Sequence, residues 1–231
     1  MVFLFPKDEQ TEKGNVLFIV LLAIVLIGAL TLAVQQSGHD ANIDKEKLII
    51  RIAEVRRYTA ELERGITFIL QNGHSESDIR FAHPDADPDY GDLSADTDKS
   101  DQMFDRLGGA AQYREPPPGI NDGSAWEFYG HTALPEVGTS AADLIAVLPN
   151  VTQSFCESYN KTLGYDEAVQ PEDTGTCIYN AASSRFDDGT QFYSSPNAVT
   201  DGSFTLRPSL SGCVQCTSDN TYHVFHVLMV R

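Results

Sequence analysis

The feature that most constrains this chain is an uncharged apolar run near its N-terminus, residues 16–34 (VLFIVLLAIVLIGALTLAV). About nineteen residues at about 1.5 Å of rise each give a helix of roughly 28 Å, close to the hydrocarbon thickness of a bilayer. The sequence therefore predicts a transmembrane helix over residues 15–35. Residues 1–14 form a short polar leader that ends in Gly14.

The position of Gly14 distinguishes this segment from an ordinary secretory signal peptide. In a signal peptide, a small-residue cleavage site follows the apolar region. Here residues 35–39 (QQSGH) offer no such site, and the glycine precedes the run instead. We therefore expect the apolar segment to stay in the mature protein.

A leader that ends in glycine directly before an apolar helix resembles the type IV pilins and the pseudopilins of type II secretion. In that family a prepilin peptidase cuts after the glycine, the new N-terminus is methylated, and the helix enters a filament. The resemblance implies that Gly14 is the processing residue and that Asn15 becomes the first residue. The family usually has a glutamate at the fifth mature position, where this chain has Ile19. This departure favours a minor or divergent subunit.

Two functions from different classes are therefore expected. The resemblance implies a structural subunit of a type IV pilus or a secretion-type pseudopilus, with the inner membrane, a prepilin peptidase and other pilin-like subunits as partners. The alternative is an uncleaved single-pass anchor that carries a periplasmic binding domain. Both predict one span in the inner membrane and a C-terminal domain in the periplasm or in an extracellular filament. Lys7 and Lys13 before the span favour this orientation.

Charge and motifs exclude other classes of function. The net charge of −17 argues against nucleic acid as a partner, because binding to phosphates depends on lysine and arginine. The sequence has no phosphate loop, no G-x-S-x-G and no H-E-x-x-H. We therefore expect no enzymatic activity.

Residues 36–73 predict an amphipathic stalk helix that follows the span. The weak helix formers at Ser37, Gly38 and Asn42 predict a kink near its start, and Asn72-Gly73 provides the stop. One side of this helix carries an apolar stripe, which is consistent with a helix packed on its own domain or with a two-stranded coiled coil. Its members recur at steps of three and four: Leu48, Ile52, Val55, Thr59, Leu62, Ile66 and Ile69.

The rest of the chain predicts an acidic loop and a compact domain. Residues 74–121 are rich in aspartate and proline, which predicts a surface loop or a linker. Residues 122–231 predict an exported globular domain with a helix at 151–163 and strands at 125–129, 144–148, 177–179, 190–193, 203–206 and 221–230. The expected fold class is α+β: a long N-terminal helix, with a membrane-spanning half and an amphipathic half, packed on a small antiparallel sheet.

All four cysteines lie in the predicted exported domain, where disulfides are expected. We expect Cys156 to pair with Cys177 and Cys213 with Cys216, although three pairings are possible in principle. A zinc site has the right number of cysteines but only one C-x-x-C pair. Redox chemistry at residues 213–216 lacks the helix that usually follows such a pair.

The acidic loop provides the one candidate metal site. Asp85, Asp87 and Asp89 occupy alternate positions and Asp96 follows eleven residues after the first, as in an EF-hand loop. Tyr90 stands where that loop has glycine, and Asp96 replaces its glutamate. Two interpretations stay open, a calcium site and a solvated acidic loop. We expect no cofactor other than calcium.

Overall fold

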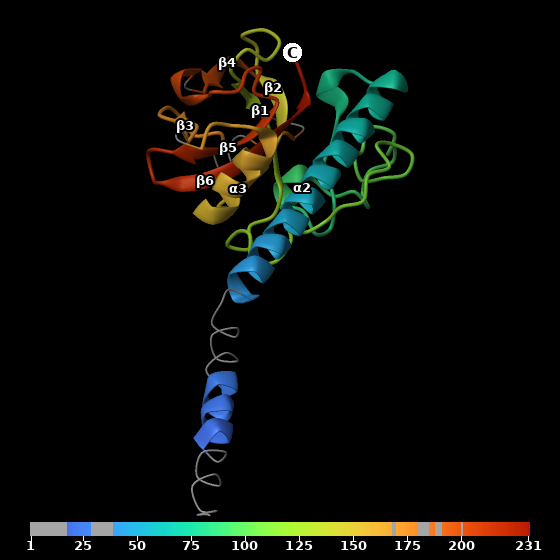
Figure 1. Cartoon of the computed structure of the whole chain (residues 1–231). Coiled ribbons are helices and arrows are strands. Elements are labelled where there is room, and N and C mark those ends of the chain that lie inside the picture. The colour runs from blue at the N-terminus through green and yellow to red at the C-terminus, as the bar shows by residue number, and fades with distance from the viewer. Residues whose placement is uncertain (1–17, 29–38, 168–169, 180–184, 188–190, 200) are drawn as a thin grey trace, which may run out of the picture. The chain divides into compact units, whose positions relative to one another are not determined.

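The computed structural model describes residues 18–28, 39–167, 170–179, 185–187, 191–199 and 201–231 (Figure 1). They fall into two units, Met1–Lys47 and Leu48–Arg231. The elements are α2 (His39–Gln71), β1 (Glu127–Ala133), β2 (Asp143–Leu148), α3 (Gln153–Leu163), β3 (Glu172–Asp173), β4 (Phe192–Ala198), β5 (Ser211–Cys216) and β6 (Thr221–Met229), with 3-10 turns at Glu76–Asp78, Pro88–Tyr90 and Asp201–Ser203. Residues 18–28 are also helical and are called the apolar helix below.

The strands form one six-stranded sheet in the order β3-β5-β6-β2-β1-β4. The four central strands, β5, β6, β2 and β1, pair antiparallel. The two edge strands pair parallel, β4 with β1 and β3 with β5. The sheet is therefore mixed, with its parallel pairs at both edges.

Strand β2 lies at the centre of the sheet and is buried on both faces. Its side chains alternate, as in any strand. Leu144, Ala146 and Leu148 point to the face that α2 and α3 cover, called the helix face here. Ile145 and Val147 point to the opposite face, called the loop face, where Val199 and Phe204 belong to the same apolar cluster, with residues of β5 and β6. Burial on both faces explains why the sequence of β2 is a continuous apolar run.

Helix α2 packs its apolar stripe on its own domain. From Ile52 onward the predicted stripe is almost completely buried, and Leu48 packs at its margin. Thr59 interrupts the apolar series, but its hydroxyl donates to the carbonyl of Arg56 at 3.1 Å, so its burial leaves no polar group unpaired. The helix ends as predicted, since Gly73 adopts a φ of 96°. The stripe is therefore a domain contact and is not available to a coiled-coil partner.

Helix α3 confirms the predicted helix at residues 151–163. The Thr152 side chain accepts from the amide of Phe155, and Gly164 closes the helix in the left-handed conformation. Such caps satisfy backbone groups that the helix itself leaves unpaired. Phe155, Cys156 and Tyr159 are buried on the helix face of the sheet.

The predicted acidic loop, residues 74–121, is called the acidic segment from here on, and it is more ordered than its composition predicts. Phe81 and Met103 are fully buried, and Tyr90 is 3% exposed. The ring of Phe81 stacks on that of Phe128 in β1 with centroids 4.0 Å apart. Figure 1 shows this segment, in green, beside α2. A few widely spaced aromatic residues thus anchor a stretch that is otherwise polar.

The expected fold class is wrong in two respects, although the general α+β class holds. First, the described residues contain no long apolar N-terminal helix: the long helix, α2, carries charged side chains along its exposed sides. Second, the sheet is mixed rather than antiparallel, because both of its edge strands pair parallel.

The predicted membrane span and the localisation that follows from it are corrected by the same observation. Among the helices that the structure describes, none combines the length and the apolar character needed to cross a bilayer. Of the predicted span, the structure describes residues 18–28, which are helical, and residues 15–17 and 29–35 lie outside the described residues. The longer α2 is too rich in charge.

The strand predictions are right in the core and poorer elsewhere. Residues 144–148 and 221–230 match β2 and β6 closely, and 125–129 and 190–193 overlap β1 and β4. The strands predicted at 177–179 and 203–206 are wrong. Strand β5 (SGCVQC) was not predicted, because glycine, serine and glutamine obscure the alternation.

Candidate functional site

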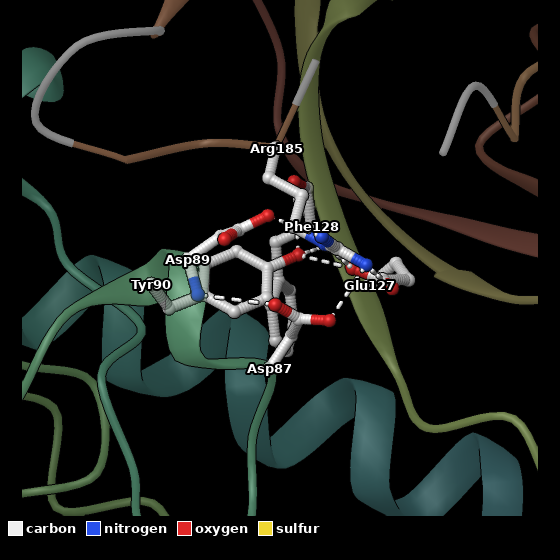
Figure 2. Close-up of polar contacts among 6 residues, drawn as sticks. All are labelled: Asp87, Asp89, Tyr90, Glu127, Phe128 and Arg185. Carbon is white, nitrogen blue, oxygen red and sulfur yellow. Dashed lines mark hydrogen bonds and ion pairs between the residues drawn. The ribbon is translucent and has the colours of Figure 1, made fainter. Parts of the chain in front are cut away.

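The most highly connected polar site joins the acidic segment to the sheet through Arg185. Its guanidinium contacts three carboxylates, those of Asp87, Asp89 and Glu127, and these four residues are called the carboxylate cluster (Figure 2). Nε donates to Glu127 Oε2 at 2.8 Å, and Nη2 donates to Oε1 at 2.8 Å. Nη1 donates to Asp89 Oδ2 at 2.6 Å, and Nη2 lies 2.8 Å from Asp87 Oδ2. One arginine thus ties three chain segments together.

Burial makes this ion pair different from a surface salt bridge. The side chains of Arg185 and Glu127 are only 9% and 8% exposed. The hydrogen bonds from Arg185 to Glu127 raise the pKa of Arg185 and outweigh the opposing effect of burial. The arginine is therefore a permanent cation, and the buried pair is held in a two-point geometry that lysine could not reproduce.

Tyr90 completes the site from the acidic segment. Its hydroxyl donates to Glu127 Oε2 at 2.7 Å and accepts from the amide of Phe128 at 2.8 Å (Figure 2). Burial raises the pKa of Tyr90 well above its ordinary value, so the phenol stays protonated and remains a donor. Glu127 therefore has donors on both carboxylate oxygens.

Local sequence explains how Asp87 and Asp89 come to share one cation. Asp87 is the N-cap of the turn Pro88–Tyr90, and its Oδ1 accepts from the amide of Asp89 at 3.0 Å. Pro88 suits the first position of such a turn, because an amide N–H at that position would have no partner within the turn and proline has none. The other carboxylate oxygen of Asp87 is left to face Arg185. The alternation that resembled an EF-hand is therefore a capped turn.

The four residues of the predicted calcium site are divided among three places. Asp87 and Asp89 are paired with Arg185. Asp85 lies beside His83, with 3.6 Å between Oδ2 and the ring Nδ1. Asp96 Oδ2 accepts from the side-chain amide nitrogen of Gln102, Nε2, at 2.6 Å. Calcium binding by this set stays a prediction, and it would require Arg185 to leave two of the four ligands.

The arrangement of the carboxylate cluster favours a structural role over a chemical one. The Arg185 guanidinium is paired with all three carboxylates. Both carboxylate oxygens of Glu127 accept hydrogen bonds from Arg185 or Tyr90. No described side chain in it has the free nucleophile or base that catalysis would need. The cluster is a clamp between residues 87–90, β1 and residue 185.

All four cysteines form disulfides, but the expected pairing is wrong. Cys156 of α3 pairs with Cys213 of β5, and Cys177 pairs with Cys216 of β5. Cys213 and Cys216 are three residues apart on an extended strand, so they point to opposite faces about 10 Å apart, too far for a bond. Cys213 lies on the helix face beside α3, so Cys156 is its partner. The two disulfides fasten β5 on both faces.

One group of three possible metal ligands occurs in the described part of the chain: Cys177, Cys216 and His223. Both sulfurs are committed to a disulfide. Nδ1 of His223 accepts from the amide of Asn150 at 3.2 Å, and Nε2 lies 2.6 Å from the Thr221 hydroxyl. That hydroxyl donates to Asp219, so Nε2 is the donor to Thr221. Neither sulfur nor nitrogen is free to bind zinc in this arrangement.

A second buried histidine, His131, lies on β1 and is 3% exposed. Neither ring nitrogen has a hydrogen-bond partner among the described residues, and the same holds for the hydroxyl of Tyr129. Burial lowers the pKa of His131 to about 4, and the nearby backbone of Cys177 offsets only part of this effect. His131 is therefore neutral at pH 7 and costs stability when it is protonated.

We expect His131→Phe to reduce the acid sensitivity of folding. The folded protein binds a proton at His131 only near pH 4, whereas the unfolded chain binds one near pH 6.5. Stability from this residue is therefore complete above pH 6.5 and lost as the pH falls to 4, by at most about 3 kcal/mol. Urea unfolding of both proteins at several pH values measures the difference. A difference that is constant over this range would contradict the prediction.

Two predicted site residues, Gly14 and Asn15, lie outside the described residues. Next to them in the chain is the apolar helix, whose large side chains are 50–64% exposed: Phe18, Ile19, Val20, Leu21, Leu22, Ile24, Val25, Leu26 and Ile27. An apolar side chain of this size gains about 1.5–3 kcal/mol when it is buried. A helix that is apolar on every side is normally buried. The apolar helix is thus the largest exposed apolar surface in the described part of the chain.

Comparison with known proteins gives no relative. No protein-family model, no curated protein and no solved structure matches this chain. The function has to be argued from the residues and the geometry.

Proposed function

We propose that the chain is a structural subunit of a type IV pilus or a pseudopilus, a minor or divergent one, that assembles through its apolar helix. The observation that carries the proposal is the exposure of all nine large side chains between Phe18 and Ile27. Helices of this kind bury their apolar side chains against one another when they pack side by side. The expected neighbours are the apolar helices of other pilin-like subunits.

The rest of the molecule supports a structural role. The described cysteines are all in disulfides, and the largest buried ion pair is saturated internally. The domain from Leu48 onward buries its own apolar stripe of α2 in its core. Among the described residues, the longest run of exposed large apolar side chains lies in the apolar helix, as expected for a subunit that joins an assembly through that helix.

Processing at Gly14 is the part of this proposal that separates it from a plain binding module. On the pilin-like account a prepilin peptidase removes residues 1–14, and Asn15 becomes the N-terminus next to the apolar helix. Removal of the polar leader, which carries Asp8, Glu9 and Glu12, leaves an N-terminus that a bundle of apolar helices can accommodate.

The test is the intact mass and the N-terminal sequence of the protein isolated from its native source. We expect a chain that begins at Asn15, with a methylated amine. Gly14→Val is expected to leave the leader in place, whereas Glu12→Gln, a neighbouring change in the same leader, is expected to be processed normally. A wild-type chain that still begins at Met1 would contradict the pilin-like function and favour a binding module.

A further inference from the structure

The Cys177–Cys216 disulfide and His223 form a compact group on the loop face of the sheet. The two sulfurs and one ring nitrogen of His223 all lie within 4.8 Å of one another. In a tetrahedral zinc site the ligand atoms are about 3.6–3.8 Å apart, because zinc lies about 2.3 Å from sulfur and about 2.0–2.1 Å from nitrogen. The three side chains are thus within reach of a single metal ion, although the disulfide occupies both sulfurs.

The hairpin of β5 and β6 fixes two of these three side chains. Val214 pairs with His223, and Cys216 lies two residues after Val214, so Cys216 and His223 share the loop face. Cys177 reaches them from the segment that follows β3, and β3 is itself paired with β5. The pairing of these strands depends on backbone hydrogen bonds, so the frame can stay in place when the disulfide opens.

Hydrogen bonds orient the His223 ring as they do in metal sites. Nε2 donates to the Thr221 hydroxyl at 2.6 Å, and that hydroxyl donates to Asp219 at 2.7 Å. Nδ1 therefore carries the lone pair, which accepts from the amide of Asn150 at 3.2 Å. Histidine ligands usually donate their second ring N–H to a carboxylate or another acceptor in this way. Nδ1 can thus bind a metal at the loss of one long hydrogen bond.

The Cys177–Cys216 disulfide is also the more accessible of the two. Cys177 is half-buried, whereas Cys156, Cys213 and Cys216 are fully buried. Exposed disulfides are the labile ones, because the reductant has to reach a sulfur atom. The bond at Cys177 is therefore expected to open first.

The charges around the group suit a dication. Burial lowers the pKa of His223 to about 4, and the nearby carboxylates of Asp219 and Asp122 oppose this effect. Two thiolates neutralise Zn²⁺, so the bound metal leaves no net charge to bury. Thiolate and imidazole are the ligands that zinc prefers, and water takes the fourth position where a protein supplies three.

We propose that Cys177, Cys216 and His223 form a redox-controlled zinc site, which the disulfide closes and reduction opens. A phosphine reductant gives two electrons to the S–S bond and takes an oxygen atom from water, so that it becomes the phosphine oxide. The two protons of that water leave both sulfurs as thiols. Zinc then displaces these protons and binds the two thiolates and Nδ1. The site is separate from the apolar helix, so its failure and the failure of the proposed function are distinguishable.

The test compares the reduced and the oxidised full chain with zinc chloride. A phosphine is the reductant, because a dithiol would itself bind zinc. We expect the reduced chain to bind one zinc ion, and its melting temperature to rise with zinc concentration in a saturable way. Cobalt(II) in place of zinc should give the thiolate-to-metal absorption of a four-coordinate site after reduction, and no such absorption in the oxidised chain.

Two variants separate this site from other thiols. His223→Gln should weaken zinc binding by the reduced chain by about tenfold or more. His226→Gln is the matched control, since His226 lies on the same strand but pairs with Ala146 on the helix face, and it should leave the affinity unchanged. Cys177→Ala should be as stable as the reduced wild type without zinc, because both lack the bond, and zinc should not stabilise it.

Three results overturn the proposal. The first is that zinc does not stabilise the reduced wild-type chain. The second is that reduced Cys177→Ala binds zinc as tightly as the reduced wild type, which would assign the metal to Cys156 and Cys213. The third is that the oxidised chain gives the same cobalt absorption as the reduced chain.

Discussion

Replacing Arg185 by glutamine lowers the free energy of unfolding by about 3–5 kcal/mol. The substitution leaves three carboxylates facing one another, and Glu127 is 8% exposed, so its charge is neither paired nor hydrated. The loss is larger than the attraction that the pair provides, because an uncompensated charge stays behind in the interior. Unfolding in urea, followed by tryptophan fluorescence, measures the change, since the single tryptophan, Trp126, is buried beside β1.

A matched control removes the same charge from the surface. Lys161 pairs with Glu167, but both side chains are more than 60% exposed. Lys161→Gln is therefore expected to change the free energy of unfolding by less than about 1 kcal/mol. In the double variant Arg185→Gln with Glu127→Gln, part of the lost stability should return, because no buried charge is left unpaired. A loss below about 1 kcal/mol in Arg185→Gln itself would show that the clamp does not hold the acidic segment.

Removal of the Cys156–Cys213 disulfide is expected to cost about 4 kcal/mol. The cysteines are 57 residues apart, and a bond that closes a loop of this length restricts the unfolded chain. Without the bond the unfolded state gains conformational entropy, which lowers the free energy of unfolding by about 4 kcal/mol. Both sulfurs are fully buried between α3 and β5, so alanine at both positions keeps the contact apolar. Unfolding of Cys156→Ala with Cys213→Ala, compared with the wild type under oxidising conditions, gives the value.

Reducing conditions provide the control for this second prediction. In the presence of a dithiol reductant that opens both disulfides, the double variant and the wild type should differ by less than about 1 kcal/mol. The difference that oxidation restores then belongs to the bond and not to the side chains. Equal stability of the two proteins under oxidising conditions would contradict the pairing of α3 with β5.

Local signals in the sequence predict α2 and α3 well, because the causes of these two helices are local. The stripe from Ile52 to Ile69 follows the 3.6-residue period, and it is the face that α2 buries. Thr152 and Gly164 mark the ends of α3 through caps that involve only neighbouring residues. The apolar run at residues 144–148 becomes β2 because it is buried on both faces.

The elements that the sequence failed to predict depend on contacts between distant residues. Strand β5 has few residues that favour strands, and it exists because β6 pairs with it along its whole length. The disulfide pairing depends in turn on β5, since its pleat separates Cys213 from Cys216. Without the strand, spacing along the chain favours the wrong pairs.

The candidate sites show the same limit. The turn around Asp87 and Asp89 has a local cause, but Arg185 lies 96 residues after Asp89, and nothing in the spacing announces their contact. One observation could have raised the possibility: Arg185 stands directly before Phe186 in a chain with 33 acidic and 16 basic residues, and an arginine that follows an aromatic neighbour into the interior needs carboxylate partners.

The central claim is that the apolar helix assembles against like helices, and photo-crosslinking tests it most directly. A photoreactive phenylalanine analogue is placed at Leu22, in the apolar helix, or at Asp98, an exposed residue of the acidic segment, in the otherwise intact chain. Our account predicts abundant crosslinks from position 22 to residues 15–35 of neighbouring copies or of other pilin-like subunits, and few from position 98. Crosslinks from position 22 that are no more frequent than from position 98, or that map to globular surfaces, would contradict it.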